Sequence, residues 1–304
     1  MYYKLDIKIM KYLKLIRFQN LVAMALIQYL IRYSLLIPTY GKNAVLGDLY
    51  FGLLVFSILL IAAGAYVIND YFDIQVDTLN DKVLVGRNIK RRVALILHAL
   101  FTFVGVVLGF YVAYKVGYIL LGAILAISAY TLWIYSLKLK RKLFIGNFVI
   151  AKLSAVFTVS LAIFEIAPNF NHEASLHLIA ILYIYAIFTF ICSLMHEVIK
   201  DLKGSIADAQ FNIKTLATEW GETKTKEFLK WMSIALAFMV CIVSFYEFSS
   251  NNYALCYAAV TIVSPLFLLN YWIYKAQNRE DYTKISTLNK LIIFAGILSL
   301  VFFI

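Results

Sequence analysis

Long apolar segments alternate along the chain with short segments that hold most of its charges. Each apolar segment has the length that an α-helix needs to cross the hydrocarbon core of a bilayer. The pattern therefore predicts an all-α membrane protein with nine transmembrane helices. The predicted spans are residues 21–37, 49–68, 93–113, 117–137, 143–166, 175–199, 228–248, 253–274 and 286–304.

The composition agrees with a polytopic membrane protein. Hydrophobic residues make up 63% of the 304 residues, and only three Pro and thirteen Gly leave little room for linkers. Such a composition is far too apolar for an ordinary soluble domain. We expect a single domain over residues 1–304, built from two approximate halves, 1–142 and 143–304. The three Cys fit neither a disulfide framework nor a zinc spacing.

The basic residues predict the orientation in the membrane. Most of the 28 Lys and Arg precede the first span or follow spans two, four, six and eight. The positive-inside rule places these segments in the cytoplasm. The exceptions are Arg32, Lys42, Lys115 and Lys152. The net charge of +11 reflects this asymmetry, and no basic stretch with exposed aromatic residues indicates nucleic acid as a partner.

An acidic cluster follows the second span. Asn69, Asp73 and Asp77 are spaced at i, i+4 and i+8, so they share one face if the helix continues. Carboxylate and amide oxygens are the ligands that Mg²⁺ prefers, and Mg²⁺ usually binds together with phosphate groups. The cluster predicts chemistry on a lipid phosphate or diphosphate at the cytoplasmic surface.

A second acidic cluster follows the sixth span, four helices later. Glu197 and Asp201 are one helical turn apart, and Asp208 is expected one loop further on. Each half thus contributes one acidic helix end, and two such ends facing each other would enclose Mg²⁺ ions and a diphosphate. The alternative to a metal site is that the acids only cap their helices. Capping would account for a single acidic cluster, but less well for two clusters at equivalent positions in the two halves.

Basic residues near the clusters are candidates for binding the diphosphate. Lys82 and Arg87 follow the first cluster, and Lys140 lies in the next cytoplasmic loop. Cationic side chains stabilise the charge of a departing diphosphate. Lys152 stands about 13 Å into the fifth span, and intramembrane charges usually face a cavity. We expect Lys152, with Asn147, to contact an anionic acceptor or the diphosphate; a snorkelling or paired lysine is the alternative.

These motifs resemble those of the UbiA family of intramembrane prenyltransferases, over the whole chain. The resemblance is carried by Arg17-x-x-Asn20, Asn69-Asp70-x-x-Asp73-x-x-x-Asp77, Lys82 with Arg87, Tyr135-Ser136 with Lys140-Arg141, and Glu197-x-x-x-Asp201 with Asp208 and Lys214-Thr215-Leu216. It departs from the family in the second motif, where Lys203, Gly204 and Ile206 replace acids that other members carry. His196 stands where many members have Arg.

The resemblance implies a bundle of nine helices around a central cavity, and the Mg²⁺-dependent transfer of a polyprenyl group from an allylic diphosphate to an acceptor. The implied metal ligands are Asn69, Asp73, Asp77, Glu197, Asp201 and Asp208. The expected catalytic residues are Asp73, Asp77, Asp201, Arg87 and Lys140. The expected substrate-binding residues are Asn20, Asn69, Lys82, Tyr135, Ser136, Asn147, Lys152 and Lys200.

The acceptor is less constrained by the sequence than the donor. His-Glu-Val-Ile-Lys-Asp at 196–201 and the basic run 85–92 are most similar to the branch that transfers geranylgeranyl groups to geranylgeranylglyceryl phosphate. A lipid or an aromatic acceptor, such as 4-hydroxybenzoate or a naphthoate, is compatible with the motifs. The sequence also leaves open a terpene cyclase, a lipid-binding scaffold and a cation-coupled transporter, although the acids of transporters usually lie near the membrane midplane.

Overall fold

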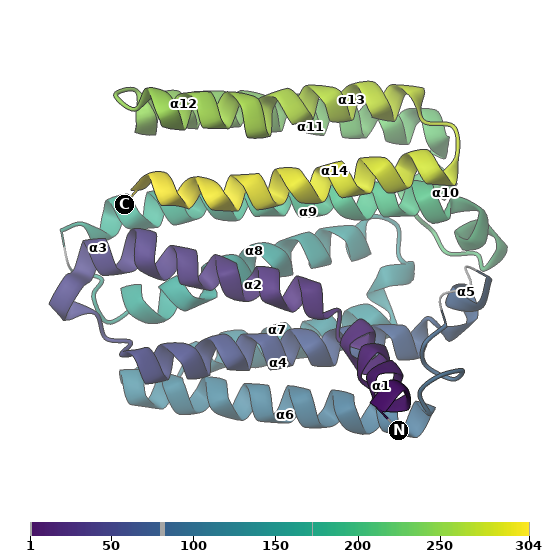
Figure 1. Ribbon diagram of the computed structural model, residues 1–304, viewed down its shortest axis with the longest axis horizontal. Helices are drawn as coiled ribbons and strands as arrows, with labels where there is room; N and C mark the ends of the chain where they lie inside the picture. Colours follow the sequence, from purple (N-terminus) through teal and green to yellow (C-terminus); the bar gives the residue numbers. More distant parts are fainter. Residues whose placement is uncertain (1, 80–82, 172, 304) are drawn as a thin grey trace. The chain divides into compact units, whose positions relative to one another are not determined.

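The computed structural model describes residues 2–79, 83–171 and 173–303, and over these ranges the regular structure is helical. Figure 1 shows the helices as long rods joined by short loops. The helices are α1 (Tyr2–Leu15), α2 (Phe18–Ile31), α3 (Ile37–Tyr40), α4 (Asp48–Phe72), α5 (Ile74–Leu79), α6 (Arg91–Val116), α7 (Leu121–Leu137), α8 (Ile145–Ile166), α9 (Ser175–Gln210), α10 (Leu216–Glu219), α11 (Gly221–Phe248), α12 (Asn252–Ala258), α13 (Ser264–Lys275) and α14 (Arg279–Leu298).

The prediction of an all-α membrane protein is confirmed. Within the described residues, eight helical segments are long and apolar enough to cross a membrane. The α7 helix, with 17 residues, is shorter and corresponds to the remaining predicted span, 117–137. In two of the eight segments a π-helical turn joins two α-helices, α2 to α3 and α12 to α13.

The helices form two compact units, each with its own packing. The predicted halves, 1–142 and 143–304, stay a prediction. The first unit comprises residues 1–32, 39–140 and 157–176, and the second comprises residues 33–38, 141–156 and 177–304.

In the first unit, α4 packs closely against α6 and α7 (Figure 1). Ser57 of α4 donates a hydrogen bond of 2.6 Å to the carbonyl oxygen of Gly105 in α6. A Cβ atom at Gly105 would lie 2.9 Å from the carbonyl oxygen of Ser57, so only glycine allows this approach. Close backbone contact of this kind is typical of helix pairs in membranes, where apolar burial alone does not drive helices together.

In the second unit, α9, α11, α13 and α14 share one apolar core. Asn289 of α14 donates a hydrogen bond of 3.0 Å to the carbonyl oxygen of Cys192 in α9. Further along the same pair of helices, a Cβ atom at Gly296 would clash with the ring of Phe188. These contacts fix the level at which α14 lies against α9.

A buried polar network anchors the loop between α3 and α4 in the first unit. The carboxylate of Glu165, whose residue is 1% exposed, accepts hydrogen bonds from the backbone N–H groups of Val45 and, at 3.0 Å, Leu46. Arg32 donates to the carbonyl oxygen of Leu46 at 2.9 Å and pairs with Asp48 at 2.8 Å. Buried backbone groups outside regular helices are thereby satisfied.

We expect Glu165→Leu to destabilise the protein by about 2 kcal/mol, because the buried N–H of Leu46 loses its acceptor. The apparent Tm in detergent should fall by several degrees, and Glu173→Gln, at an exposed acid, should leave it unchanged. An unchanged Tm for Glu165→Leu would show that the carboxylate does not hold the loop.

Candidate active site

The first acidic cluster lies at the end of α4, and the helix does not continue through it. Asp73 caps α4 with backbone angles φ −91° and ψ 2°, and α5 begins at the next residue. The condition under which Asn69, Asp73 and Asp77 would share one face, a helix that continues through them, is therefore not met. The reason is local, because Asp side chains compete for backbone hydrogen bonds and favour helix ends.

Asp73 contacts two other residues of the predicted site. Asn69 donates a hydrogen bond of 2.9 Å to the Asp73 carboxylate, and the ammonium group of Lys140 forms an ion pair with it. The Asp73 side chain is 15% exposed, so the pair is largely shielded from water. The structure thus brings three of the predicted site residues together. The Asp77 side chain and the whole of Lys82 lie outside the described residues.

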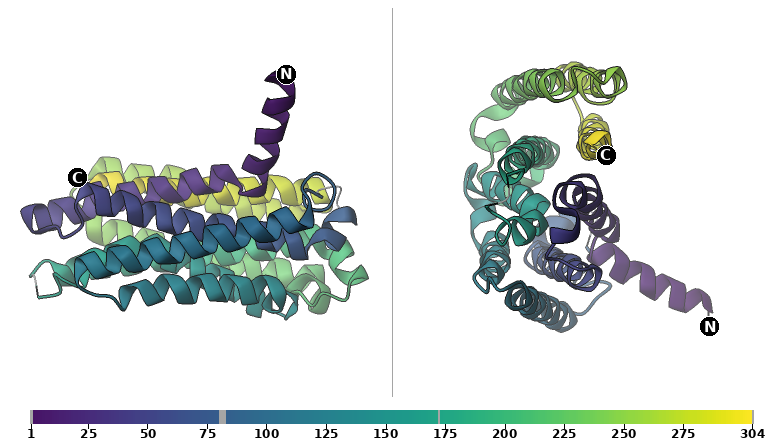
Figure 2. Two further views of the ribbon diagram at one scale, coloured as in Figure 1. Left: turned by 90° about the horizontal axis from the view of Figure 1, so that it is seen from below. Right: turned by 90° about the vertical axis from the view of Figure 1, so that its left-hand side faces the viewer.

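Asp70, between the predicted ligands, contacts the start of the chain instead. Arg17 pairs with Asp70 at 3.1 Å, and its guanidinium carbon lies 4.7 Å from the centre of the Tyr66 ring. Asn20 reaches the Tyr66 hydroxyl at 3.5 Å. Arg17 adopts left-handed backbone angles at the junction of α1 and α2, where Figure 2 shows α1 turning away from α2 and α4. The sequence motif indicated Arg17 and Asn20 but not their partners.

The other basic and hydroxyl candidates of the first unit occupy the same end of its helices. Arg87 is exposed on a tight turn, in which Gly86 has a φ of 95°. Val85 and Ile89 on either side of that turn are buried in a cluster with residues of α1, α4 and α6. Tyr135 and Ser136 are buried at the end of α7; Ser136 donates back to the carbonyl oxygen of Leu132.

The second acidic cluster lies on one uninterrupted helix. The α9 helix runs through Gln210, so the expectation that Asp208 follows in a loop is wrong. One glycine, Gly204, costs only about 1 kcal/mol in a helix and does not end it. At about 100° per residue, Glu197, Asp201 and Asp208 fall within about 40° of one another around α9. They form an acidic line along the helix.

Polar partners hold the acidic line in place. Asn147 of α8 donates a hydrogen bond of 2.7 Å to Asp201, and Lys200 pairs with Glu197 at 3.0 Å. A Cβ atom at Gly204 would lie 3.5 Å from the Asp208 carboxylate. The structure thus brings together Asn147 and Asp201 as partners. Lys152, five residues after Asn147, is exposed on another side of α8, and its contact with substrate stays a prediction.

The donor set of both clusters fits Mg²⁺ rather than a softer metal. The groups are carboxylate and amide oxygens, and Mg²⁺ is usually held by one or two carboxylates, with water and phosphate oxygens completing its octahedron. No three His, Cys, Asp or Glu side chains among the described residues gather into a complete metal cage. A diphosphate bound together with the ion can supply the missing oxygens.

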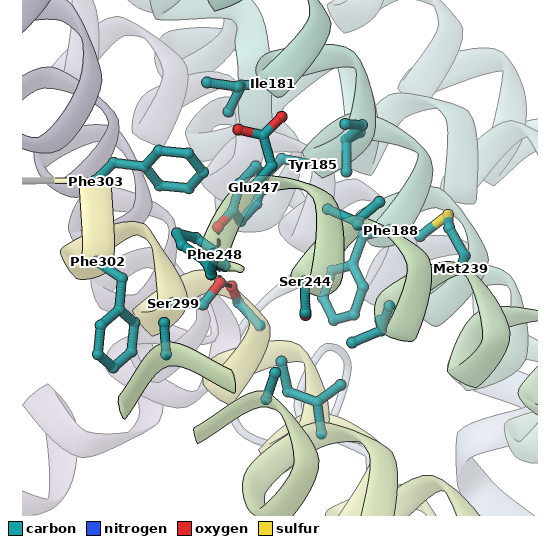
Figure 3. Close-up of a pocket in the computed structure, with 17 residues that line it drawn as sticks. Ile181, Tyr185, Phe188, Met239, Ser244, Glu247, Phe248, Ser299, Phe302 and Phe303 are labelled. Carbon is teal, nitrogen blue, oxygen red and sulfur yellow. Dashed lines mark hydrogen bonds between the residues drawn. The ribbon is translucent and has the colours of Figure 1, made fainter. Parts of the chain in front are cut away.

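The second unit also contains a cavity of about 50 Å³, away from the acidic line. Figure 3 shows its mainly apolar walls, with the hydroxyl groups of Tyr185 and Ser299 joined at 2.7 Å. Phe188 is the lining residue of α9 nearest in sequence to Glu197. Nine residues separate the two, or about 13 Å along the helix, so this cavity is not part of the acidic site.

The chain matches known proteins along nearly its whole length. The model of the UbiA prenyltransferase family matches residues 25–299. The digeranylgeranylglyceryl phosphate synthase of Sulfolobus acidocaldarius is 29% identical over 289 residues, which are 93% of this chain and 96% of that protein. The synthase of the same name from Methanosphaera stadtmanae is 24% identical over 257 residues, covering 83% of this chain and 85% of its own.

Solved structures show the same fold. A structure of digeranylgeranylglyceryl phosphate synthase has a TM-score of 0.62 at 23% identity and covers 97% of this chain and 99% of its own. A UbiA homologue from Archaeoglobus fulgidus, bound to DMAPP and Mg²⁺, has a TM-score of 0.62 at 15% identity, covering 95% of this chain and 99% of its own. The match to the family model covers most of the sequence and therefore establishes the family of this chain. This chain belongs to the UbiA prenyltransferase family.

Proposed function

We propose that the protein transfers a geranylgeranyl group from its diphosphate to the free hydroxyl of a glyceryl phosphate that already carries one geranylgeranyl ether. The observation that carries the proposal is the full-length similarity to synthases of digeranylgeranylglyceryl phosphate. Because that product carries two prenyl groups and one phosphate on three glycerol oxygens, the acceptor has one hydroxyl left to react.

The bonds that change follow from these two substrates. The acceptor oxygen forms a bond to the allylic carbon, and the bond between that carbon and the diphosphate oxygen breaks. The bonding electrons leave with the diphosphate, which also takes up the hydroxyl proton. Positive charge develops on the allylic carbon during the reaction, so the protein must hold the diphosphate, orient the hydroxyl and exclude water.

Both acidic clusters are proposed to hold Mg²⁺ and diphosphate, with Asn69, Asp73 and Asp77 in one and Glu197, Asp201 and Asp208 in the other. When bound, Mg²⁺ supplies positive charge that makes the diphosphate a better leaving group. The oxygen chemistry of the two clusters supports this role.

Basic and polar side chains are proposed to complete the site. Lys82, Arg87, Lys140 and Lys200 hold diphosphate oxygens; Asn20, Tyr135, Ser136, Asn147 and Lys152 contact the substrates. We place the site on the cytoplasmic side, because the loops next to both clusters carry most of the basic residues.

The proposed function is tested with purified protein in nanodiscs supplied with geranylgeranyl diphosphate and Mg²⁺. The acceptors are geranylgeranylglyceryl phosphate, 4-hydroxybenzoate and a naphthoate, and a further reaction contains no acceptor. Mass spectrometry should show the diether phosphate alone. An aromatic product would identify a quinone-type prenyltransferase, and a hydrocarbon or alcohol formed without acceptor would identify a cyclase. Either result, or no product at all, contradicts the proposal.

Lys140 is expected to compete with Mg²⁺ when no diphosphate is bound, because its ammonium group pairs with Asp73. Lys140→Met should therefore bind Mg²⁺ about fivefold more tightly, as expected for the loss of an ion pair worth about 1 kcal/mol. Calorimetry without diphosphate measures the affinity. Lys140→Arg keeps the charge and should resemble the wild type; a weaker affinity for Lys140→Met would show that Lys140 supports metal binding instead.

A further inference from the structure

A second polar line runs along α9 beside the acidic line. Thr189, His196 and Lys203 are spaced at i, i+7 and i+14, so they fall within about 40° of one another around the helix. His196 lies about 100° from Glu197 on the side of Cys192, whose carbonyl oxygen binds Asn289 of α14. The line therefore lies between the acidic line and the edge of α9 that contacts α14.

Three buried polar atoms along this line have no hydrogen-bond partner among the described residues. They are Thr189 Oγ1, His196 Nδ1 and Asn289 Oδ1. Other hydroxyls within helices, such as those of Ser128 and Thr261, bond to the carbonyl four residues earlier, but that of Thr189 does not. A buried polar atom without a partner costs about 1–3 kcal/mol. Three such atoms along about 10 Å of α9 indicate a bound group that supplies the partners.

The charges around His196 favour an anionic group. Lys200, Lys203 and Lys290 are close enough to act electrostatically on the His196 ring, and Glu197 is the opposing acid. Three ammonium groups against one carboxylate leave the surroundings positive. Lys290 follows directly after Asn289, which contacts the Cys192 carbonyl one turn before His196, and the Lys290 side chain is exposed.

We propose that His196 and Lys290 bind the phosphate group of the acceptor, with His196 Nδ1 donating to a phosphate oxygen and Lys290 pairing with its charge. This inference rests on the proposed function, because it assigns the phosphate to the glyceryl phosphate that receives the prenyl group. The hydroxyl group of the same head group, or water bound with it, donates to Asn289 Oδ1, and an ether oxygen accepts from the Thr189 hydroxyl. The acceptor is held through its phosphate beside the acidic line, and an uncharged or aromatic acceptor lacks this contact.

The test measures equilibrium binding in nanodiscs of zwitterionic lipid, without prenyl diphosphate or Mg²⁺. The two probes are geranylgeranylglyceryl phosphate and the same lipid without its phosphate, geranylgeranylglycerol. We expect His196→Leu and Lys290→Met each to weaken binding of the phosphate-bearing probe about tenfold, as for the loss of a charge-assisted hydrogen bond. Binding of geranylgeranylglycerol should stay unchanged.

Matched variants separate binding from folding. His196→Asn places an amide donor near the position of Nδ1 and should retain most of the affinity for the phosphate-bearing probe. Lys284→Met removes an exposed lysine of the same helix as Lys290 and should have no effect. Equal losses for both probes, or no loss for either, would overturn the assignment.

The source of the phosphate is decided by a second set of nanodiscs that contain anionic phosphatidylglycerol. If His196→Leu and Lys290→Met bind the acceptor as tightly as the wild type but bind less phosphatidylglycerol, the site holds a membrane head group, and the assignment to the acceptor is wrong. The two proposals can fail separately. If the wild-type protein binds the phosphate-bearing probe through His196 and Lys290 but forms no ether product, the phosphate site is supported and the proposed function is wrong.

Discussion

Asp73→Asn is expected to lower kcat for prenyl transfer about a hundred- to a thousandfold, the usual cost of removing one group that stabilises transition-state charge. Asp73 accepts from Asn69 and pairs with Lys140, so its charge organises both neighbours. Asn keeps the shape of the side chain and removes only the charge. Rates are measured by mass spectrometry with both substrates saturating.

Asp73→Asn should also change the dependence of activity on Mg²⁺ concentration. Its activity should require a higher Mg²⁺ concentration than that of the wild type, while its apparent Tm stays within a few degrees. Glu227→Gln, which changes an acid near the start of α11, is the matched control and should retain full activity. A fully active Asp73→Asn would remove the first cluster from the reaction.

Asp201→Asn should cause a loss of kcat of similar size, because Asp201 of the second cluster is held by a side chain from another helix, α8. Its carboxylate accepts the 2.7 Å hydrogen bond from Asn147. Asn147→Leu leaves the carboxylate in place without its donor, and we expect a loss of about tenfold. An Asn147→Leu variant as inactive as Asp201→Asn would instead indicate that Asn147 contacts substrate directly.

The double variant Asp73→Asn/Asp201→Asn tests whether the two clusters serve one reaction. Groups that act as a unit are strongly non-additive, so the double variant should be about as slow as the slower single variant. If the two losses multiply, the clusters act independently, and the prediction from the sequence that both clusters bind one diphosphate is wrong.

Much of the architecture was predictable from the sequence, because bilayer thickness fixes the length of a spanning helix and leaves its uncharged residues easy to recognise. The exact course of the helices at the membrane surface was not. Polar segments there can continue, cap or interrupt a helix at similar cost. Asp73 ends α4, whereas the equally polar segment around Gly204 stays within α9.

Residue type and local spacing were enough to identify the membrane-spanning helices, the two acidic motifs and the family that they resemble. The partners of those residues depend on how distant helices pack, so they could be read only from the folded chain. Arg17 with Asp70, Lys140 with Asp73 and Asn147 with Asp201 are pairs separated by many residues. The polar line beside α14 likewise arises from packing, since no local pattern records which side of α9 a distant helix covers.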